Sequence, residues 1–259
     1  MEPFVIITGA SSGLGKELAI QLAAKQHNII LVARNEKSLL EVKMLIEEQY
    51  KVNVIVLPID LSIAENALKL YDQVISLNVA ISSLINNAGV GLYGEFKETS
   101  LEEELKMIEL NISSLVALTK VFIQYFLKNG GGKIMNIASL LSFLPFPYFS
   151  VYSATKSFVL SFTETVAAEL EGTNVAVLAL CPGTIDTPFH SDKMWNTNAY
   201  QTNKPMPVEK VAIAGVKLLE KGKGKTIVGF NNWFISNLPR LTPDFIMIKI
   251  KKYLASQKK

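Results

Sequence analysis

The feature that most constrains the fold is a regular alternation of short apolar runs with segments of helical spacing along the chain. Phe4–Ile7 is apolar and β-branched, and Lys16–Lys25 after it carries apolar residues at helical intervals. This alternation predicts an α/β fold: a doubly wound parallel sheet with right-handed crossovers and helices on both faces, three layers in all. Further strands are expected at His27–Val32, Val52–Leu57, Ser83–Ile85, Lys133–Ala138, Val175–Leu180 and Thr226–Val228, and further helices at Leu101–Leu127, Val151–Glu169 and Val208–Leu219.

Length and composition narrow the class of protein. With 259 residues, 49% of them hydrophobic, the chain is expected to form one domain over residues 1–259. A net charge of +3 is too small to indicate a nucleic-acid partner. The single cysteine, Cys181, excludes an internal disulfide and suits a reducing compartment. The apolar run Phe4–Thr8 is far too short for a signal peptide, so a cytoplasmic protein is expected.

A glycine loop, Thr8–Gly15, separates the first strand from the first helix, with glycines at positions 9, 13 and 15. Strand, glycine loop and helix in this order point backbone N–H groups and a helix N-terminus at a phosphate. A tight turn needs glycine in any case, so the spacing alone indicates a turn as readily as a ligand site.

The end of the second strand indicates which dinucleotide the chain would bind. In nicotinamide-binding sheets an acidic residue at this position bonds the ribose 2′-hydroxyl, whereas an arginine accommodates a 2′-phosphate. Here Ala33 takes the acidic position, Arg34 follows it, and Lys37 is a further nearby positive charge. The pattern favours NADP(H) over NAD(H), although a solvated arginine is the simpler alternative.

Other polar residues also fall where strands end. Asp60 would cap the following helix or bond an adenine amine. Asn86–Gly89 would let the backbone approach a ribose or would form a plain turn. Asn111 lies in the middle of an expected helix, where asparagine is unfavourable, so it should have a hydrogen-bonding role.

Tyr152 and Lys156 lie one turn apart on an expected helix, with Ser139 thirteen residues before the tyrosine. A free tyrosine has a pKa near ~10, and a neighbouring ammonium would move it toward a useful value. Ser139 would hold a substrate oxygen while Tyr152 exchanges its proton. Ser142 is an alternative hydroxyl.

Together these motifs resemble the short-chain dehydrogenase/reductase family, in its single-domain branch of about this length. The resemblance runs from Phe4 to about Gly229 and rests on the glycine loop, Asp60, Asn86–Gly89, Asn111, Ser139, Tyr152/Lys156 and Pro182–Thr187. It implies a Rossmann-like domain that exchanges hydride between a nicotinamide cofactor and a carbonyl or alcohol substrate, with no metal.

The resemblance also implies roles for individual residues. Tyr152 would be the general acid for reduction, Lys156 would lower its pKa and hold the nicotinamide ribose, Ser139 would orient the substrate, and Asn111 would hold a proton-relay water. The cofactor would be bound by Gly9, Ser11, Ser12, Gly13, Leu14, Gly15, Arg34, Asp60, Leu61, Asn87, Ala88, Gly89, Tyr152, Lys156, Pro182, Gly183, Ile185 and Thr187. One departure is that positions 11 and 12 are both serine, where NADP-preferring relatives often carry a basic residue.

Aromatic and apolar residues surround the expected site. The family places a mobile lid after the Pro-Gly motif, here at about 188–207. The substrate, held by Ser139 and Tyr152, would contact Phe143, Met194 and Trp195, beside Phe146 and Tyr148, in a fairly apolar pocket. The alternative is that these side chains pack on the core or on a sister subunit.

The C-terminal tail, about 230–259, includes an apolar and lysine-rich segment, Thr242–Leu254. Such a basic amphipathic segment can lie on an anionic membrane, dock on its own domain or contact a partner subunit. Docking on protein is favoured over membrane contact. The resemblance implies a homodimer or homotetramer built from the Leu101–Leu127 and Val151–Glu169 helices.

The leading expectation is an NADPH-dependent reductase of a fairly apolar ketone or aldehyde. The alternatives are oxidation of a secondary alcohol, such as a hydroxysteroid-like or sugar-like substrate, and reduction of a 3-oxoacyl thioester, for which Lys193 and Lys204 would supply basic charge. A dinucleotide sensor or scaffold would use the fold without chemistry. A methyltransferase has no use for Ser139, Tyr152 and Lys156, and the longer epimerase branch has a different glycine spacing.

Overall fold

The structure is a computed structural model, and it describes residues 2–144, 146–187, 189, 194, 196–199, 204–240 and 242–256, without the side chains of 240 and 244. In this part of the chain all paired strands run parallel in one sheet. Their bounds are β1 Phe4–Thr8, β2 Asn28–Ala33, β3 Val54–Pro58, β4 Ile81–Asn86, β5 Gly132–Ile137, β6 Val175–Cys181 and β7 Lys225–Ile227. The strand order is β3-β2-β1-β4-β5-β6-β7, the order of doubly wound dinucleotide-binding sheets.

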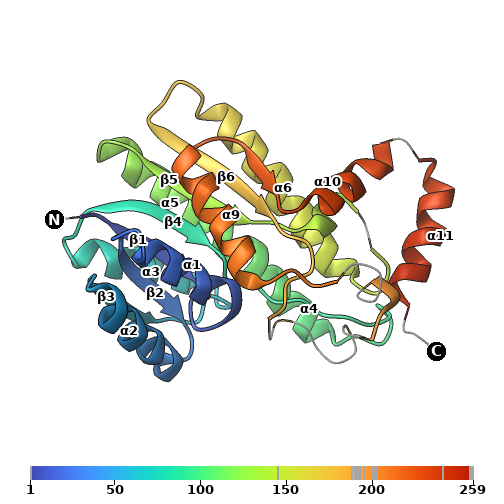
Figure 1. Ribbon diagram of the computed structural model, residues 1–259, viewed down its shortest axis with the longest axis horizontal. Coiled ribbons are helices and arrows are strands. Elements are labelled where there is room, and N and C mark those ends of the chain that lie inside the picture. Colours follow the sequence, from blue (N-terminus) through green and yellow to red (C-terminus); the bar gives the residue numbers. More distant parts are fainter. Residues whose placement is uncertain are drawn as a thin grey trace.

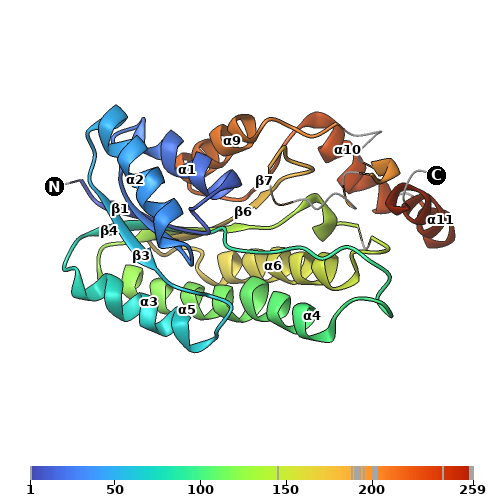
Figure 2. The same cartoon turned by 90° about the horizontal axis from the view of Figure 1, so that it is seen from below.

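Helices cover both faces of the sheet, and Figure 2 shows the three layers edge-on. One face carries α1 (Gly13–Ala23), α2 (Glu36–Tyr50) and α9 (Val208–Lys221); the other carries α3 (Glu65–Ser76), α4 (Leu101–Ile108), α5 (Ser114–Lys128) and α6 (Ser150–Glu169). Two further helices, α10 (Phe230–Asn237) and α11 (Asp244–Ala255), lie at the end of the molecule where the strands finish (Figure 1). The expected three-layer α/β fold is confirmed.

The core has two halves because side chains alternate across each strand. In β1, Val5 and Ile7 pack beneath α1 and α9, while Phe4 and Ile6 pack on the other side against α3 and α5. All five residues of β1 are buried. A strand covered on both faces must be apolar throughout, which explains the continuous apolar run in the sequence.

The predicted single helix Leu101–Leu127 is interrupted. A π-helical turn, η1 (Glu109–Ser113), separates α4 from α5 and contains the buried Asn111. Such turns insert one extra residue per turn and often mark functional sites. Among the other helices, α2 and α10 have no counterpart in the sequence expectations. In α10 the large residues Phe230, Trp233 and Phe234 lie exposed rather than on one buried face.

The run Leu101–Lys128 is long and apolar enough to cross a membrane, with a mean hydropathy of 1.4 in its most apolar stretch. Here its Leu118, Phe122 and Phe126 are fully buried against the sheet and α3. Core helices of globular proteins have the same composition, so this run carries no argument for a membrane span.

Candidate active site

A cavity of about 540 Å³ lies at the carboxyl ends of the strands. This is the edge at which ligands bind in doubly wound sheets. Its walls come from the loops after β1, β2, β3, β4, β5 and β6 and from α6. The expected site residues that line it are Gly9, Ser11, Ser12, Gly13, Leu14, Arg34, Asp60, Leu61, Asn87, Ala88, Gly89, Ser139, Tyr152, Lys156, Pro182, Gly183, Ile185 and Thr187.

The glycine loop turns sharply into α1 beneath this cavity. Gly9 and Gly13 have φ angles of +64° and +53°, in the left-handed region that favours glycine. Gly15 does not line the cavity; a Cβ there would lie 2.3 Å from the Gly9 carbonyl oxygen and 2.5 Å from Asn87 Nδ2. Gly15 therefore allows close packing beneath the loop rather than contact with a ligand.

Ser12, the N-cap of α1, makes no side-chain capping hydrogen bond, and the first turn of the helix has no acidic residue. In the described part of the chain, the backbone N–H groups of the first turn of α1, which begins at Gly13, are thus left without a side-chain acceptor. Where no cap is present, water or a bound ligand can accept hydrogen bonds from such groups. This arrangement fits a pyrophosphate.

The loop after β4 is tied to the loop after β1. The hydroxyl of Thr8 accepts hydrogen bonds from the N–H groups of Asn87 (3.0 Å) and Ala88 (2.9 Å), and the amide of Asn87 donates to the Thr8 carbonyl (2.9 Å). The sequence analysis did not assign this role to Thr8. A hydroxyl directly before the first glycine is the signal for it.

Arg34 and Asp60 line the far end of the same cavity. Arg34 is exposed, as a side chain that binds a solvent-accessible phosphate can be. The carboxylate of Asp60 accepts from the N–H (2.9 Å) and hydroxyl (2.7 Å) of Ser62. Asp60 therefore caps the turn after β3 and not the helix itself, since α3 begins at Glu65.

Tyr152 and Ser139 meet at the other end of the cavity. Desolvation raises the pKa of Tyr152 to about 12, and a hydrogen bond with Ser139 acts in the opposite direction. The sequence predicts that Lys156 lowers this pKa; in the structure the net change in the pKa of Tyr152 is upward, because burial is its largest cause. At neutral pH Tyr152 is therefore a protonated phenol.

Lys156 is buried, and its ammonium donates to the Ile137 carbonyl at 2.8 Å. The Nζ atom lies 5.9 Å from the centroid of the Tyr152 ring. Desolvation lowers the pKa of Lys156 to about 8, against a smaller opposing effect of Cys181. A buried ammonium whose pKa lies near neutrality is typical of functional sites.

Ser142, the alternative hydroxyl, does not line the cavity. It accepts from the Ser139 N–H at 3.1 Å and donates to the Lys156 carbonyl at 2.7 Å. Ser142 thus links the strand end that carries Ser139 to the helix that carries Lys156.

Asn111 lies behind the cavity wall. Its amide accepts from the N–H of Val90 and donates to the carbonyl of Val90, both at 3.0 Å, and it also donates to the Thr155 hydroxyl at 3.2 Å. A Cβ at Gly89 would lie 3.0 Å from Asn111 Oδ1 and 3.5 Å from Lys156 Nζ. Asn111 therefore fixes the loop after β4 beside Lys156.

Of the expected substrate contacts, Ser139 and Tyr152 line the cavity. The other three lie elsewhere or outside the described residues. Phe143 packs with Leu140, Leu144 and the Lys225 ammonium, away from the cavity. Met194 is buried with Phe146, Phe149 and Ala255 in a cluster that borders Tyr152, and Trp195 lies outside the described residues. A loop that turns back on the strand end directs Phe143 toward β7, which its position in the sequence does not reveal.

Phe189 is the aromatic residue that the sequence analysis did not single out. It lines the cavity with its ring centroid 5.7 Å from that of Tyr152. Half of the expected lid segment 188–207 lies outside the described residues. The two ends of this segment are held together by an isolated β-bridge between Ile185 and Met206. Asn198 donates hydrogen bonds to backbone carbonyls near the end of α11.

Comparison with known proteins agrees with this geometry. The family model for short chain dehydrogenase matches residues 3–197. An NADP-dependent 3-hydroxy acid dehydrogenase from Schizosaccharomyces pombe is 30% identical over 80% of this chain and 83% of its own length. A very-long-chain 3-oxoacyl-CoA reductase from Anas platyrhynchos is 29% identical over 98% of this chain and 81% of its own length.

Among solved structures, a short-chain dehydrogenase from Sphingobium yanoikuyae in complex with NADPH superposes with a TM-score of 0.80. It is 27% identical and covers 92% of this chain and 93% of its own. The family model matches most of the chain, and the solved structure has the same fold. The chain belongs to the short-chain dehydrogenase family.

Proposed function

We propose that the protein is an NADP(H)-dependent oxidoreductase that reduces a fairly apolar ketone or aldehyde to an alcohol. The observation that carries the proposal is the convergence of three features on one cavity: the uncapped N-terminus of α1, Arg34 at one end, and Ser139, Tyr152 and Lys156 at the other. A dinucleotide sensor or scaffold would not need the last three side chains.

The preference for NADPH rests on Arg34 and Ala33. With alanine at the position of the ribose-binding acid, nothing there repels a 2′-phosphate, and Arg34 can form a charge-assisted hydrogen bond with it. The NADPH complex of one neighbour and the NADP-dependent relative support this assignment. Ser11 and Ser12, which also line the cavity, would add neutral hydrogen bonds.

The bound nicotinamide would supply the hydride. Tyr152, protonated at neutral pH because its pKa is about 12, would give its phenolic proton to the substrate oxygen. Ser139 would hold that oxygen through its hydroxyl. The Lys156 ammonium would favour the phenolate that forms and bind ribose hydroxyls.

Reprotonation of Tyr152 would pass through Lys156. We assign the relay water to η1, because a π-helical turn releases main-chain carbonyl groups from regular hydrogen bonding. The side chain of Asn111 itself is occupied by Val90 and Thr155.

The substrate would be apolar near its carbonyl. Phe189 faces Tyr152 directly, and Phe149 approaches the same ring at 6.3 Å between centroids. A 3-oxoacyl thioester is the second candidate, favoured by the 3-oxoacyl-CoA reductase among the relatives. Oxidation of a secondary alcohol would use the same groups in reverse.

Side-by-side fluorescence titrations with NADPH and NADH, followed by a panel of apolar ketones, aldehydes and 3-oxoacyl thioesters, test the proposal. We expect tighter binding of NADPH and its oxidation by at least one carbonyl class. Preference for NADH would contradict the role of Arg34, and absence of binding to either would favour a different function for the fold.

We also propose a cytoplasmic homodimer or homotetramer. Leu101, Leu105 and Phe158 are exposed on α4 and α6, beside a shallow apolar groove that includes Ile112 and Phe96. Size-exclusion chromatography with light scattering should give a multiple of 28.6 kDa. A monomer would contradict this assembly without affecting the proposed chemistry.

A further inference from the structure

The two C-terminal helices present an unusual surface. Helix α11 packs on the body through a single stripe of Met247, Lys251 and Ala255, with Leu254 beside it. The stripe covers the aromatic cluster that borders Tyr152, and the Tyr93 hydroxyl donates to the Ala255 carbonyl at 2.8 Å. The inner face of α11 is thus packed against the cluster that borders Tyr152.

The rest of α11 carries large apolar side chains that no part of the described chain covers. Phe245 and Tyr253 are 67% and 66% exposed, and Ile248 is 60% exposed. An amphipathic helix of a globular protein normally places its large apolar residues on the buried face. In α11 the single buried stripe accounts for only a minority of them.

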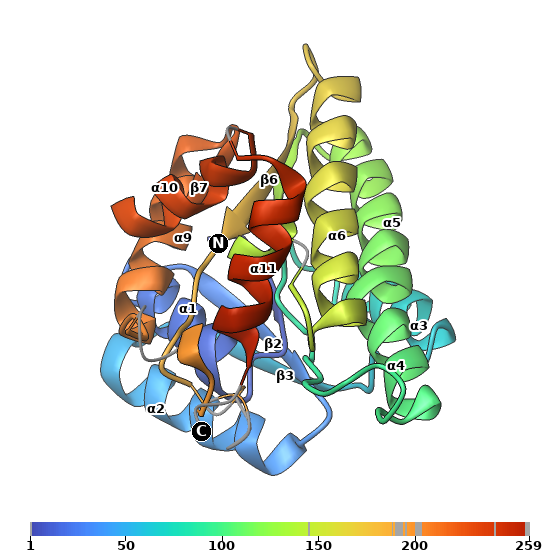
Figure 3. The ribbon, with the colours of Figure 1, turned by 90° about the vertical axis from the view of Figure 1, so that its right-hand side faces the viewer.

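Helix α10 continues this surface. Phe230, Trp233 and Phe234 are 76%, 51% and 56% exposed, and the rings of Phe230 and Trp233 stack at 5.9 Å. Ile235 and Leu238 pack against the same small core as Met247, which joins α10 to α11. Figure 3 shows both helices on the end of the molecule that faces the viewer. We call this the α10–α11 surface: Phe230, Trp233, Phe234, Phe245, Ile246, Ile248, Ile250 and Tyr253.

Charge is concentrated in the same segment. Residues 230–259 contain six lysines and arginines and one acidic residue, Asp244, whereas residues 1–229 contain 20 basic and 22 acidic residues. Lys249 and Lys252 are exposed among the apolar residues of α11. The segment is therefore strongly basic on a chain that is otherwise slightly acidic.

Aromatic side chains interspersed with lysines are suited to the interface of an anionic bilayer, where rings enter the headgroup region and ammonium groups meet lipid phosphates. We propose that the α10–α11 surface docks the protein on an anionic lipid membrane, as a peripheral attachment that goes beyond the proposed reaction. Docking in this orientation brings the end of the cavity that holds Tyr152 toward the lipid.

Charge argues against a second copy as the occupant. A two-fold interface places the same patch on both subunits, so the basic segments would face each other. The surface proposed above for self-association, on α4 and α6, is separate from the α10–α11 surface.

Cosedimentation of the full-length protein with vesicles tests the proposal without any assay of turnover. We use phosphatidylcholine alone and phosphatidylcholine with about one third phosphatidylglycerol. We expect binding to the second vesicle only, weakened at least about tenfold when salt rises from about 0.05 to about 0.5 M. Equal binding to both vesicles, or none to either, would overturn the proposal.

Two sets of substitutions locate the contact. Trp233→Ser with Phe234→Ser and Phe245→Ser removes aromatic area, and Lys249→Glu with Lys252→Glu reverses charge. Each set should weaken vesicle binding at least about tenfold, since one basic residue near an anionic surface is worth roughly fivefold. NADPH titration and thermal melting confirm that the variants are folded.

Matched controls change equally exposed residues on α2, α3 and α5: Met44→Ser with Leu68→Ser, and Lys69→Glu with Lys128→Glu. These should leave vesicle binding within about twofold of wild type. Equal losses in control and test variants would overturn the assignment of the surface. A change from oligomer to monomer in the aromatic variant, without any vesicle binding by the wild type, would instead identify a second copy as the occupant.

Discussion

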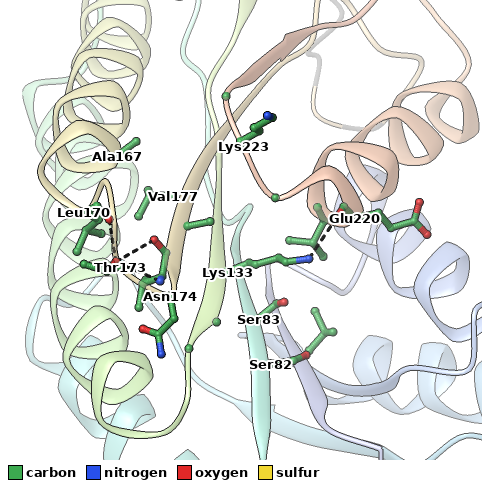
Figure 4. Close-up of a pocket in the computed structure, with 18 of the residues that line it drawn as sticks. Ser82, Ser83, Lys133, Ala167, Leu170, Thr173, Asn174, Val177, Glu220 and Lys223 are labelled. Carbon is green, nitrogen blue, oxygen red and sulfur yellow. Dashed lines mark hydrogen bonds between the residues drawn. The ribbon is translucent and has the colours of Figure 1, made fainter.

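The two ends of the sheet each carry a cavity, and the larger one is not the candidate active site. At the carboxyl ends the cavity measures about 540 Å³, and at the amino ends a groove of about 760 Å³ runs beside Gly131, Lys133 and Asn174. Figure 4 shows polar groups of this groove bonded to their neighbours: Lys133 Nζ donates to the Glu220 carbonyl, and the Thr173 hydroxyl to the Leu170 carbonyl. The volume of a cavity therefore does not identify the active site. The polar groups that are free to bind a ligand identify it.

The direction of the chain explains the difference. At the carboxyl edge each strand runs toward the N-terminus of a helix, where N–H groups are free for an anion. At the amino edge helices finish, and their last turns are closed by the chain itself. Gly222, with φ of +68°, ends α9 by donating to the Leu218 carbonyl, as a left-handed helix cap does. At the carboxyl edge glycines thus shape a loop for a ligand, whereas at the amino edge Gly222 ends a helix.

Tyr152→Phe should have the largest effect. Removal of the phenolic proton is expected to reduce kcat by about 10²–10⁴-fold while NADPH affinity and thermal stability change little. Tyr50→Phe, at the end of α2, serves as the matched control and should retain full turnover. A Tyr152→Phe enzyme with wild-type kcat would refute the proposed acid.

Lys156→Met should reduce turnover by roughly 10²-fold and yet stabilise the fold by about 1–3 kcal/mol at pH 7, because the buried ammonium is costly. Below pH 8 Lys156 is charged both folded and unfolded, so the full penalty applies; between pH 8 and 10.5 the folded state loses its proton first and the penalty fades. The gain in stability, measured by urea titration, should therefore shrink as pH rises. A variant less stable than wild type at every pH would contradict this account.

Gly15→Ala and Gly224→Ala compare the glycines of the two edges. A Cβ at Gly15 would clash with backbone, so we expect a loss of about 2–4 kcal/mol in stability and weaker binding of both NADPH and NADH. At Gly224, with φ of +81°, a Cβ meets nothing within 4 Å, so only backbone strain of about 1–2 kcal/mol remains and cofactor affinity should not change. If Gly15→Ala and Gly224→Ala weakened NADPH binding to a similar extent, glycines at the two edges would not differ in their effect on the cofactor, and the comparison would fail.

Arg34→Ala tests the discrimination between cofactors. Loss of one charge-assisted hydrogen bond should weaken NADPH by roughly 10–100-fold and NADH by less than about threefold. Lys133→Ala, a basic residue of the amino-edge groove, should leave both affinities unchanged. Equal losses for NADPH and NADH would exclude a contact between Arg34 and the 2′-phosphate. Isothermal titration calorimetry measures all six affinities, those of wild type and of the two variants for each cofactor.

Sequence patterns are sufficient to predict the strands of the sheet, because each buried strand must be apolar on both faces. Phe4–Ile7 and Val175–Leu180 could be assigned without further knowledge, and both are strands in the structure. The sequence also predicted that Gly13, Ser139 and Tyr152 lie at the same edge of the sheet, because all strands of a parallel sheet end at one edge. The structure places the three residues around one cavity.

Other features depend on tertiary contacts that no local pattern contains. The buried Asn111 of the π-helical turn, for example, bonds Val90, twenty-one residues away in the sequence. The position of Phe143 depends on the turn after Ser139, which directs the ring toward Lys225. The raised pKa of Tyr152 likewise follows from burial, which the spacing to Lys156 cannot reveal.

Isotope transfer tests the central claim most directly. The protein is incubated with an apolar ketone or aldehyde and NADPH that carries deuterium at both hydrogen positions of C4 of the nicotinamide, and the alcohol is analysed by mass spectrometry. The account predicts deuterium in the wild-type alcohol and almost no product from Tyr152→Phe. An alcohol without deuterium, or product formed equally by Tyr152→Phe, would contradict it.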